Sequence, residues 1–157
     1  MYKVEAEIVI NAPVETVFEW VEHPEQHHHW QGSLLGTERT DEGKVVVTRK
    51  FLGRRFETHY HEREVVPHRR LRRRGRSAPH MPVRYDVDQI MEFEPVAGGT
   101  RVHATVEVDT KGALHALLPL FTRSSKHELA VSLAHLKELV EADDAVHEAL
   151  DQLPPHT

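Results

Sequence analysis

The sequence predicts an α+β fold in which an antiparallel sheet covers one long C-terminal helix. Residues 113–143 have the sequence ALHALLPLFTRSSKHELAVSLAHLKELVEAD, in which apolar side chains recur at the i, i+3, i+4 and i+7 spacing of a helix with one long apolar face. Upstream, stretches of strand character follow one another with only short turns between them. Short turns join antiparallel strands rather than parallel ones, so the strands are expected to form one sheet that covers the helix.

The composition limits the class of protein. The 157 residues suffice for one domain with one core. The chain has no cysteine, which excludes disulfides, a thiolate nucleophile and cysteine-based metal sites. Its formal net charge of -5 disfavours general nucleic-acid binding. Charges at positions 3, 5 and 7 interrupt the apolar region that a signal peptide needs, and no run of apolar residues is long enough to span a membrane. We therefore expect a soluble, cytoplasmic protein.

The N-terminal segment predicts one strand and two short helices. Apolar and charged residues alternate over residues 2–10, which is the period of a half-buried strand. Asn11 is a suitable helix cap and Pro13 suits a first helical turn, and apolar residues then recur at helical spacing as far as His23. Residues 25–31, EQHHHWQ, predict a second short helical turn or a loop.

Six further strands are predicted, which make seven with the first. Turn residues separate them, and residues 97–99 are typical of a hairpin. Pro119 lacks an amide hydrogen, so we expect a bend or short break in the last helix there. One domain is expected over residues 1–143, followed by an acidic tail over residues 144–157 that extends the helix briefly and frays. The six strands are expected at residues 34–40, 44–52, 55–66, 69–76, 83–93 and 100–108.

Three strings within this order carry a family resemblance. They are IVINAPVETVFEWVEHPEQHHHW near the start, LGRRFETHYHEREVVPHRRL in the middle and FEPVAGGTRVHATVEVD before the final helix. Together they resemble the SRPBCC superfamily of START-like, helix-grip proteins, and within it the polyketide cyclase/dehydrase-like group. The resemblance covers roughly residues 4–142 and implies a curved seven-stranded antiparallel sheet wrapped around the C-terminal helix, with a deep cavity between them for a hydrophobic ligand. Lining residues differ among members, so the resemblance implies fold rather than chemistry.

The alternation of side chains assigns an inward face to each strand, because residues two apart on a strand share a face. Apolar residues such as Val47, Phe56 and Leu71 identify the inward face, and the polar residues two positions away are assigned to the same face. The resemblance places Trp30 at the cavity mouth, unless it is a core aromatic, and His115 is a candidate acid or base. The predicted ligand-binding residues are Trp30, Arg49, Phe51, Thr58, Tyr60, Glu62, Arg73, Tyr85, Gln89, Met91, His115, Leu117 and Phe121.

Three of these inward residues are charged. A buried charge costs several kcal/mol unless it is paired, so Arg49 or Arg73 should pair with Glu62 or face water in a cavity. A satisfied core ion pair, or a one-residue bulge that turns these groups outward, is the structural alternative to a ligand-facing role.

Histidine is unusually common, with 14 residues. Residues 27–29 are consecutive histidines, and His59 and His61 share a strand face at a spacing that can chelate a transition metal. Neighbouring residues on a helix point in different directions, and the two strand histidines lie opposite Phe56 and Tyr60, hence towards solvent. A closed zinc site needs three or four convergent ligands, so the sequence predicts neither a metal nor a cofactor.

Six arginines lie between Arg69 and Arg76. A phosphate or nucleic-acid site would need accessible arginines and, ideally, aromatic platforms, which are missing from this stretch. The overall negative charge instead favours a solvated outer strand face whose arginines meet Glu57, Glu92 or Glu94 across neighbouring strands.

Two functions are therefore predicted for one cavity. The first is binding of a small hydrophobic or aromatic, polyketide-like or lipid-like ligand. The alternative is a polyketide cyclase, aromatase or dehydratase, in which residues such as Arg49 or Tyr60 polarise a carbonyl or move a proton. No GxSxG, GxxxxGK[ST] or GxGxxG string occurs, which argues against serine-nucleophile and nucleotide chemistry. A filled core would indicate an interaction protein instead.

Overall fold

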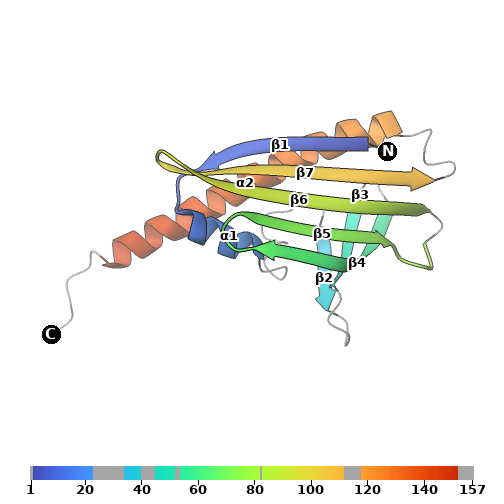
Figure 1. Ribbon diagram of the computed structural model, residues 1–157, viewed down its shortest axis with the longest axis horizontal. Coiled ribbons are helices and arrows are strands. Elements are labelled where there is room, and N and C mark those ends of the chain that lie inside the picture. The colour runs from blue at the N-terminus through green and yellow to red at the C-terminus, as the bar shows by residue number, and fades with distance from the viewer. Residues whose placement is uncertain are drawn as a thin grey trace.

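Seven strands form one antiparallel sheet, and two helices pack on one of its faces (Figure 1). The computed structural model describes residues 2–22, 34–39, 45–51, 54–81, 83–111 and 118–151. The strand order is β1-β7-β6-β5-β4-β3-β2, so β1 lies at one edge and β2 at the other. The strands are β1 Tyr2–Ile10, β2 Leu34–Arg39, β3 Val45–Phe51, β4 Arg54–Val66, β5 Arg70–Ser77, β6 Arg84–Val96 and β7 Gly99–Lys111.

Strands β6 and β7 are longer than the sequence predicts. The expected ends were residue 93 for one strand and residue 100 for the start of the other, but the ladder continues to a pair between Val96 and Gly99. Gly98 has a φ of 83°, which a glycine adopts at little cost, so the connection is a tight turn. The hairpin is therefore tighter than the predicted three-residue connection.

The helices are α1 Val14–Glu22 and α2 Leu118–Asp151, and α2 crosses the sheet diagonally beside β1 (Figure 1). The second short helix predicted at residues 25–31 lies outside the described residues. The predicted start of the long helix at residues 113–117 also lies outside them. The bend or break was expected at Pro119, which lies in the first turn of α2. Helix α2 continues through residue 143 to Asp151 without interruption. None of the described helices is long and apolar enough to cross a membrane.

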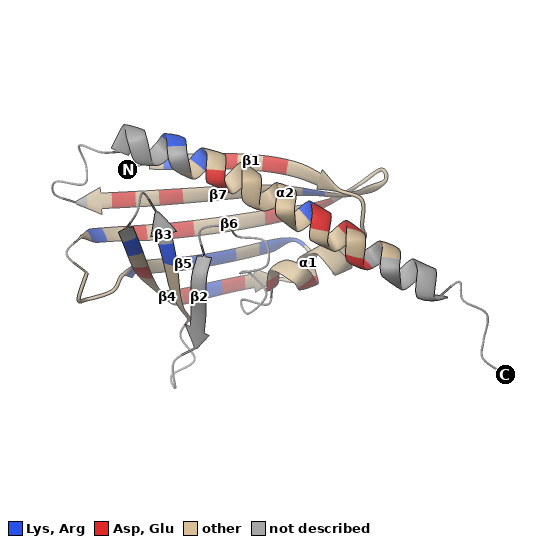
Figure 2. Cartoon of the chain, turned by 180° about the vertical axis from the view of Figure 1, so that it is seen from behind, with Lys and Arg blue, Asp and Glu red and all other residues tan. Residues whose placement is uncertain are grey.

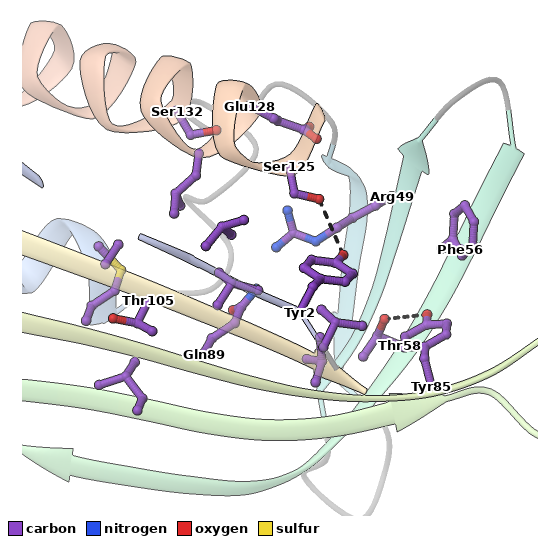
Figure 3. Close-up of a pocket in the computed structure, with 18 of the residues that line it drawn as sticks. Tyr2, Arg49, Phe56, Thr58, Tyr85, Gln89, Thr105, Ser125, Glu128 and Ser132 are labelled. Carbon is purple, nitrogen blue, oxygen red and sulfur yellow. Dashed lines mark hydrogen bonds between the residues drawn. The ribbon is translucent and has the colours of Figure 1, made fainter. Parts of the chain in front are cut away.

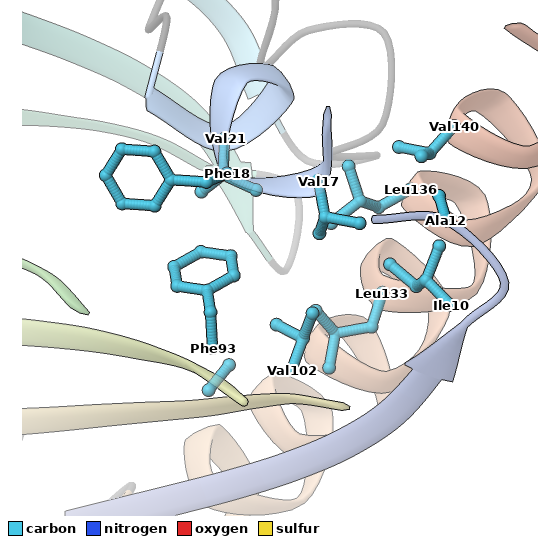
Figure 4. Close-up of a cluster of buried hydrophobic side chains, with 11 residues drawn as sticks. Ile10, Ala12, Val17, Phe18, Val21, Phe93, Val102, Leu133, Leu136 and Val140 are labelled. Carbon is cyan, nitrogen blue, oxygen red and sulfur yellow. The ribbon is translucent and has the colours of Figure 1, made fainter. Parts of the chain in front are cut away.

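The main hydrophobic core lies where α1 and α2 meet the β1, β6 and β7 end of the sheet (Figure 4). Leu133, Leu136 and Val140 of α2 are at most 1 % exposed, as the helical spacing predicts. Phe18 of α1 meets Phe93 of β6 edge to face, with ring centroids 5.3 Å apart. This core closes one end of the space between sheet and α2.

A bulge interrupts the pairing of β4 with β5. Tyr60 pairs with Gly75, but the next pair is Glu62 with Arg74, so one residue of β4 is left over. A bulge of this kind moves the following side chains to the opposite face of the sheet. The side chain of Glu62 is accordingly 62 % exposed and lies outside the fold interior.

Candidate functional site

A cavity of about 190 Å³ lies between the sheet and α2. A single buried water needs only about 10–15 Å³ of such space, so the cavity is no packing defect. It is bounded at one end by core residues such as Leu133 and Ala104. Its lining comprises the apolar residues Val4, Phe56, Val87, Ile90, Met91, Ala104, Val106, Val108, Leu129 and Leu133, and the polar residues Tyr2, Arg49, Thr58, Tyr60, Tyr85, Gln89, Thr105, Thr110, Ser125, Glu128 and Ser132.

Tyr2, Arg49 and Ser125 lie together at the end of the cavity away from the core. Thr105 and Ser132 lie at the core end, because they are the chain neighbours of Ala104 and Leu133. Figure 3 shows the Arg49 guanidinium pointing into the cavity from β3, towards Tyr2 of β1 and Ser125 of α2. At the same end Tyr85 pairs with Thr110 across β6 and β7, whereas Met91 and Ala104 pair at the apolar end. Arg49 and the phenols of Tyr2 and Tyr85 therefore lie at the end of the cavity away from the main core.

Tyr85 is the most firmly held polar group of the cavity. Its hydroxyl donates to the backbone carbonyl of Glu57 at 3.1 Å and lies 2.8 Å from Thr58 Oγ1 (Figure 3). Since a phenol has one proton and the carbonyl can only accept, Thr58 is the donor in the second bond when both form. Burial raises the pKa of Tyr85 to about 12, so this group stays neutral across the physiological range.

Tyr2 and Ser125 connect β1 to α2 across the cavity. The Tyr2 hydroxyl lies 3.4 Å from Ser125 Oγ, at the long limit for such a bond. Burial raises the pKa of the Tyr2 phenol, and the nearby Glu128 carboxylate raises it further. Both phenols therefore present neutral hydroxyls to a ligand.

Arg73 lies behind the cavity wall rather than in it. Its Nε donates to Gln89 Oε1 at 2.6 Å, and its guanidinium lies over the Tyr60 ring, 4.2 Å from the centroid. Both contacted residues line the cavity. Arg73 therefore does not line the cavity itself and influences it through Gln89 and Tyr60.

The structure brings together several of the predicted site residues and separates others. The inward orientation predicted for Glu62 is wrong, because the β4 bulge turns this side chain outward, where it lies 3.5 Å from Arg74. Trp30, His115 and Leu117 lie outside the described residues, as do the side chains of Phe51 and Phe121. The predicted residues that line the cavity are Arg49, Thr58, Tyr60, Tyr85, Gln89 and Met91.

Sequence reasoning missed Tyr2, Thr110, Ser125 and Glu128, which also line the cavity. Tyr2 shares the parity of the inward residues of β1, so the alternation already contained it. Thr110 was missed because the strand was expected to end at residue 108. The two α2 residues lie on the same helical face as Leu129, so the spacing that predicted the apolar face also contained them.

No cluster of potential metal ligands is found among the described residues. His59 and His80 instead flank the Glu57 carboxylate, each with Nε2 3.0 Å from one of its oxygens. Both histidines are solvent-accessible, at 37 % and 68 % side-chain exposure, so these contacts lie on the surface.

The arginine stretch of β5 forms an outer face in which basic residues lie between acidic residues of β4 and β6 (Figure 2). Arg72 donates twice to Asp88, at 3.1 and 2.7 Å, which lowers the pKa of that carboxyl. Arg74 lies 3.5 Å from the same carboxylate. The cross-strand pairing was expected, but the partners seen here are Asp88 and Glu62 rather than Glu57, Glu92 or Glu94.

Residues 1–141 match the family described as polyketide cyclase / dehydrase and lipid transport. The chain belongs to this family. The match agrees with the polyketide cyclase/dehydrase-like group that the three sequence strings resemble. No curated protein matches the sequence closely enough to add a named relative.

Solved structures share the fold of this polyketide cyclase/dehydrase family member at low sequence identity. A conserved protein from Geobacillus kaustophilus aligns with a TM-score of 0.76 at 11 % identity, covering 90 % of this chain and 96 % of that one. A START superfamily protein from Mycobacterium smegmatis aligns at 0.69 and 16 % identity, covering 90 % and 99 %. The di-domain ARO/CYC BexL from the BE-7585A biosynthetic pathway aligns at 0.67 and 20 % identity, covering 90 % of this chain and 47 % of that one.

Proposed function

We infer that this protein binds a small hydrophobic or aromatic ligand in the cavity between the sheet and α2. The observation that carries this proposal is the cavity itself, which combines apolar side chains such as Val108 and Met91 with polar groups such as Arg49. Ligand sites have this composition, in which apolar surface supplies affinity and the polar groups supply orientation. The family, whose description includes lipid transport, supports the same function.

A cavity-filling substitution tests the proposal. Val108 lines the cavity and is 7 % exposed, so Val108→Phe should place a ring in the ligand's space. Val9→Phe is the matched control, because Val9 is 40 % exposed on β1. We expect Val108→Phe to weaken the binding of naphthalene-sized compounds at least tenfold, and Val9→Phe to leave it unchanged, in titrations followed by tryptophan fluorescence. Equal affinities in both variants would contradict a site in this cavity.

A second candidate function is the cyclisation, aromatisation or dehydration of a polyketide-like substrate in the same cavity. The observation that favours it is the Arg49 guanidinium, which points into the cavity (Figure 3). A cation in such surroundings can stabilise the charge that develops on a carbonyl oxygen. Mass spectrometry after incubation with a poly-β-keto compound separates the two functions. Loss of one water that depends on Arg49 indicates an enzyme, whereas an unchanged mass with retained binding indicates a carrier.

A further inference from the structure

The bulge in β4 has an electrostatic consequence for the interior of the fold. Glu62 is the carboxylate that strand alternation would bring to the inner face beside Arg73, and the bulge turns it outward. Among the described residues Arg73 contacts the Gln89 amide and the Tyr60 ring and has no carboxylate within ion-pair distance. Within the described part of the chain, neutral groups alone hold this cation on the inner face.

This cation lies close enough to the cavity to act on what the cavity holds. Arg73 contacts Gln89 and Tyr60, which both line the cavity. Burial lowers the pKa of Arg73, and the positive charges of Arg49 and Arg63 lower it further. Arg63 has its own partner, Glu22, at 4.0 Å. A partly buried charge without a counter-ion is costly, and a bound anion would relieve that cost.

The charges on the cavity wall do not cancel this excess. Arg49 and Glu128 are one cation and one anion among the described residues that line it. Arg73 behind the wall then leaves an excess of one positive charge around the described part of the cavity. A neutral apolar ligand gains nothing from that excess, but an anionic one does.

We propose that the ligand of this cavity is an amphipathic carboxylate, with its apolar or aromatic body against the core end and its negative charge towards Arg49 and Gln89. This inference rests on the proposed ligand-binding function and specifies the chemistry of the ligand. It makes Arg73 a positioning residue that acts through its neighbours and through its charge.

The hydrogen-bonding groups of the cavity match such a head group. Arginine can only donate, so the bond from Arg73 fixes the Gln89 amide with its oxygen engaged, which leaves its NH2 group as a donor for the ligand. Thr110 Oγ1 is buried in the cavity wall and has no hydrogen-bond partner among the described residues. An acceptor oxygen on the ligand would satisfy such donors, and carboxylates offer two.

The test compares two probes of the same shape, 2-naphthoic acid and its neutral amide 2-naphthamide, by isothermal titration calorimetry at pH 7.5. We expect the wild-type protein to bind the acid about tenfold more tightly than the amide, which corresponds to one good charge-assisted contact. Arg73→Gln removes the charge and should reduce this preference to less than threefold. Arg73→Lys keeps the charge and should retain most of it.

Arg76→Gln is the matched control, because Arg76 lies on the same strand and is exposed on the opposite face of the sheet. This substitution changes the net charge by the same amount as Arg73→Gln. It should keep the full preference for the acid. Equal binding of acid and amide by the wild-type protein would overturn the inference and leave the proposed function standing. An unchanged preference in a folded Arg73→Gln variant would overturn the role of Arg73. Failure of both probes to bind would count against the proposed function itself.

Discussion

Gly75 lies beside the bulge in β4, where no side chain has room. A Cβ at this position would lie 2.9 Å from the His59 carbonyl oxygen and equally close to Thr58 Cγ2 and Tyr60 Cδ1. Thr58 and Tyr60 line the cavity, so Gly75→Ala should push them into the ligand's space. We expect a loss of about 1–3 kcal/mol in the free energy of unfolding and clearly weaker binding of 2-naphthamide.

Gly98→Ala is the control for this prediction. Its Cβ would meet nothing within 4 Å, and the cost comes only from the φ of 83°, about 1 kcal/mol. Urea unfolding and calorimetry should therefore show a modest loss of stability with unchanged binding in this variant. If Gly75→Ala also binds the probe normally, the wall at Thr58 and Tyr60 does not define the site.

The Tyr85 hydroxyl should give the protein a measurable alkaline instability. Its pKa rises from 10.0 to about 12 on folding, because burial disfavours the phenolate. The folded state therefore holds the proton more tightly than the unfolded chain, and this contribution is complete below pH 10 and is lost as pH rises towards 12. The loss should reach about 2 kcal/mol, which is below the full value of a two-unit shift because the group is partly solvated.

Tyr85→Phe separates this effect from other alkaline titrations. The variant should lose about 1–2 kcal/mol at pH 7, because Thr58 and the Glu57 carbonyl lose their partner. Between pH 10 and 12 its stability should then fall less steeply than that of the wild-type protein in urea unfolding. Parallel curves for the two proteins would rule out Tyr85 as the source.

Among the elements, α2 contributes the core at one end of its inward face and the cavity wall at the other. Leu136 is fully buried, so Leu136→Ala should cost about 2–5 kcal/mol in the free energy of unfolding. Val131 is 37 % exposed on the same helix, and Val131→Ala should change stability by no more than about 0.5 kcal/mol. Guanidinium unfolding of both variants measures the contrast, and similar losses would mean that the helix is held by propensity rather than by packing.

The sequence predicted the elements well and the finer geometry less well, for reasons visible in particular residues. Helical spacing marked Leu133 and Leu136, and alternation marked Tyr85 and Gln89, because burial imposes those periods directly on the chain. Glu62 was misplaced because a bulge adds one residue and reverses the parity that alternation relies on. The cavity volume, the contacts of Arg73 with Gln89 and Tyr60 and the hydrogen bonds of Tyr85 depend on the packing of distant strands, which local patterns do not encode.

At the scale of the whole molecule, the sheet, α1 and the first part of α2 form the folded unit, and the end of α2 projects past them (Figure 1). Val140 is fully buried and is the last such residue among the described side chains of α2. The Glu141 carboxylate accepts a hydrogen bond from the backbone amide of Asn11 at 2.9 Å and another from Lys137. These contacts tie the helix to the start of α1. Residues beyond 143 are consequently expected to add little to the stability of the domain.

Two truncations test where the domain ends. A chain that stops after residue 143 retains Val140 and Glu141 and should keep its melting temperature within a few degrees and its probe affinity unchanged. A chain that stops after residue 139 loses one fully buried valine and the bond to the Asn11 amide, which should cost about 2–4 kcal/mol and lower the melting temperature by roughly 6–12 °C. If the longer truncation product were as unstable as the shorter one, residues 144–157 would belong to the folded unit, and the boundary predicted at residue 143 would be wrong.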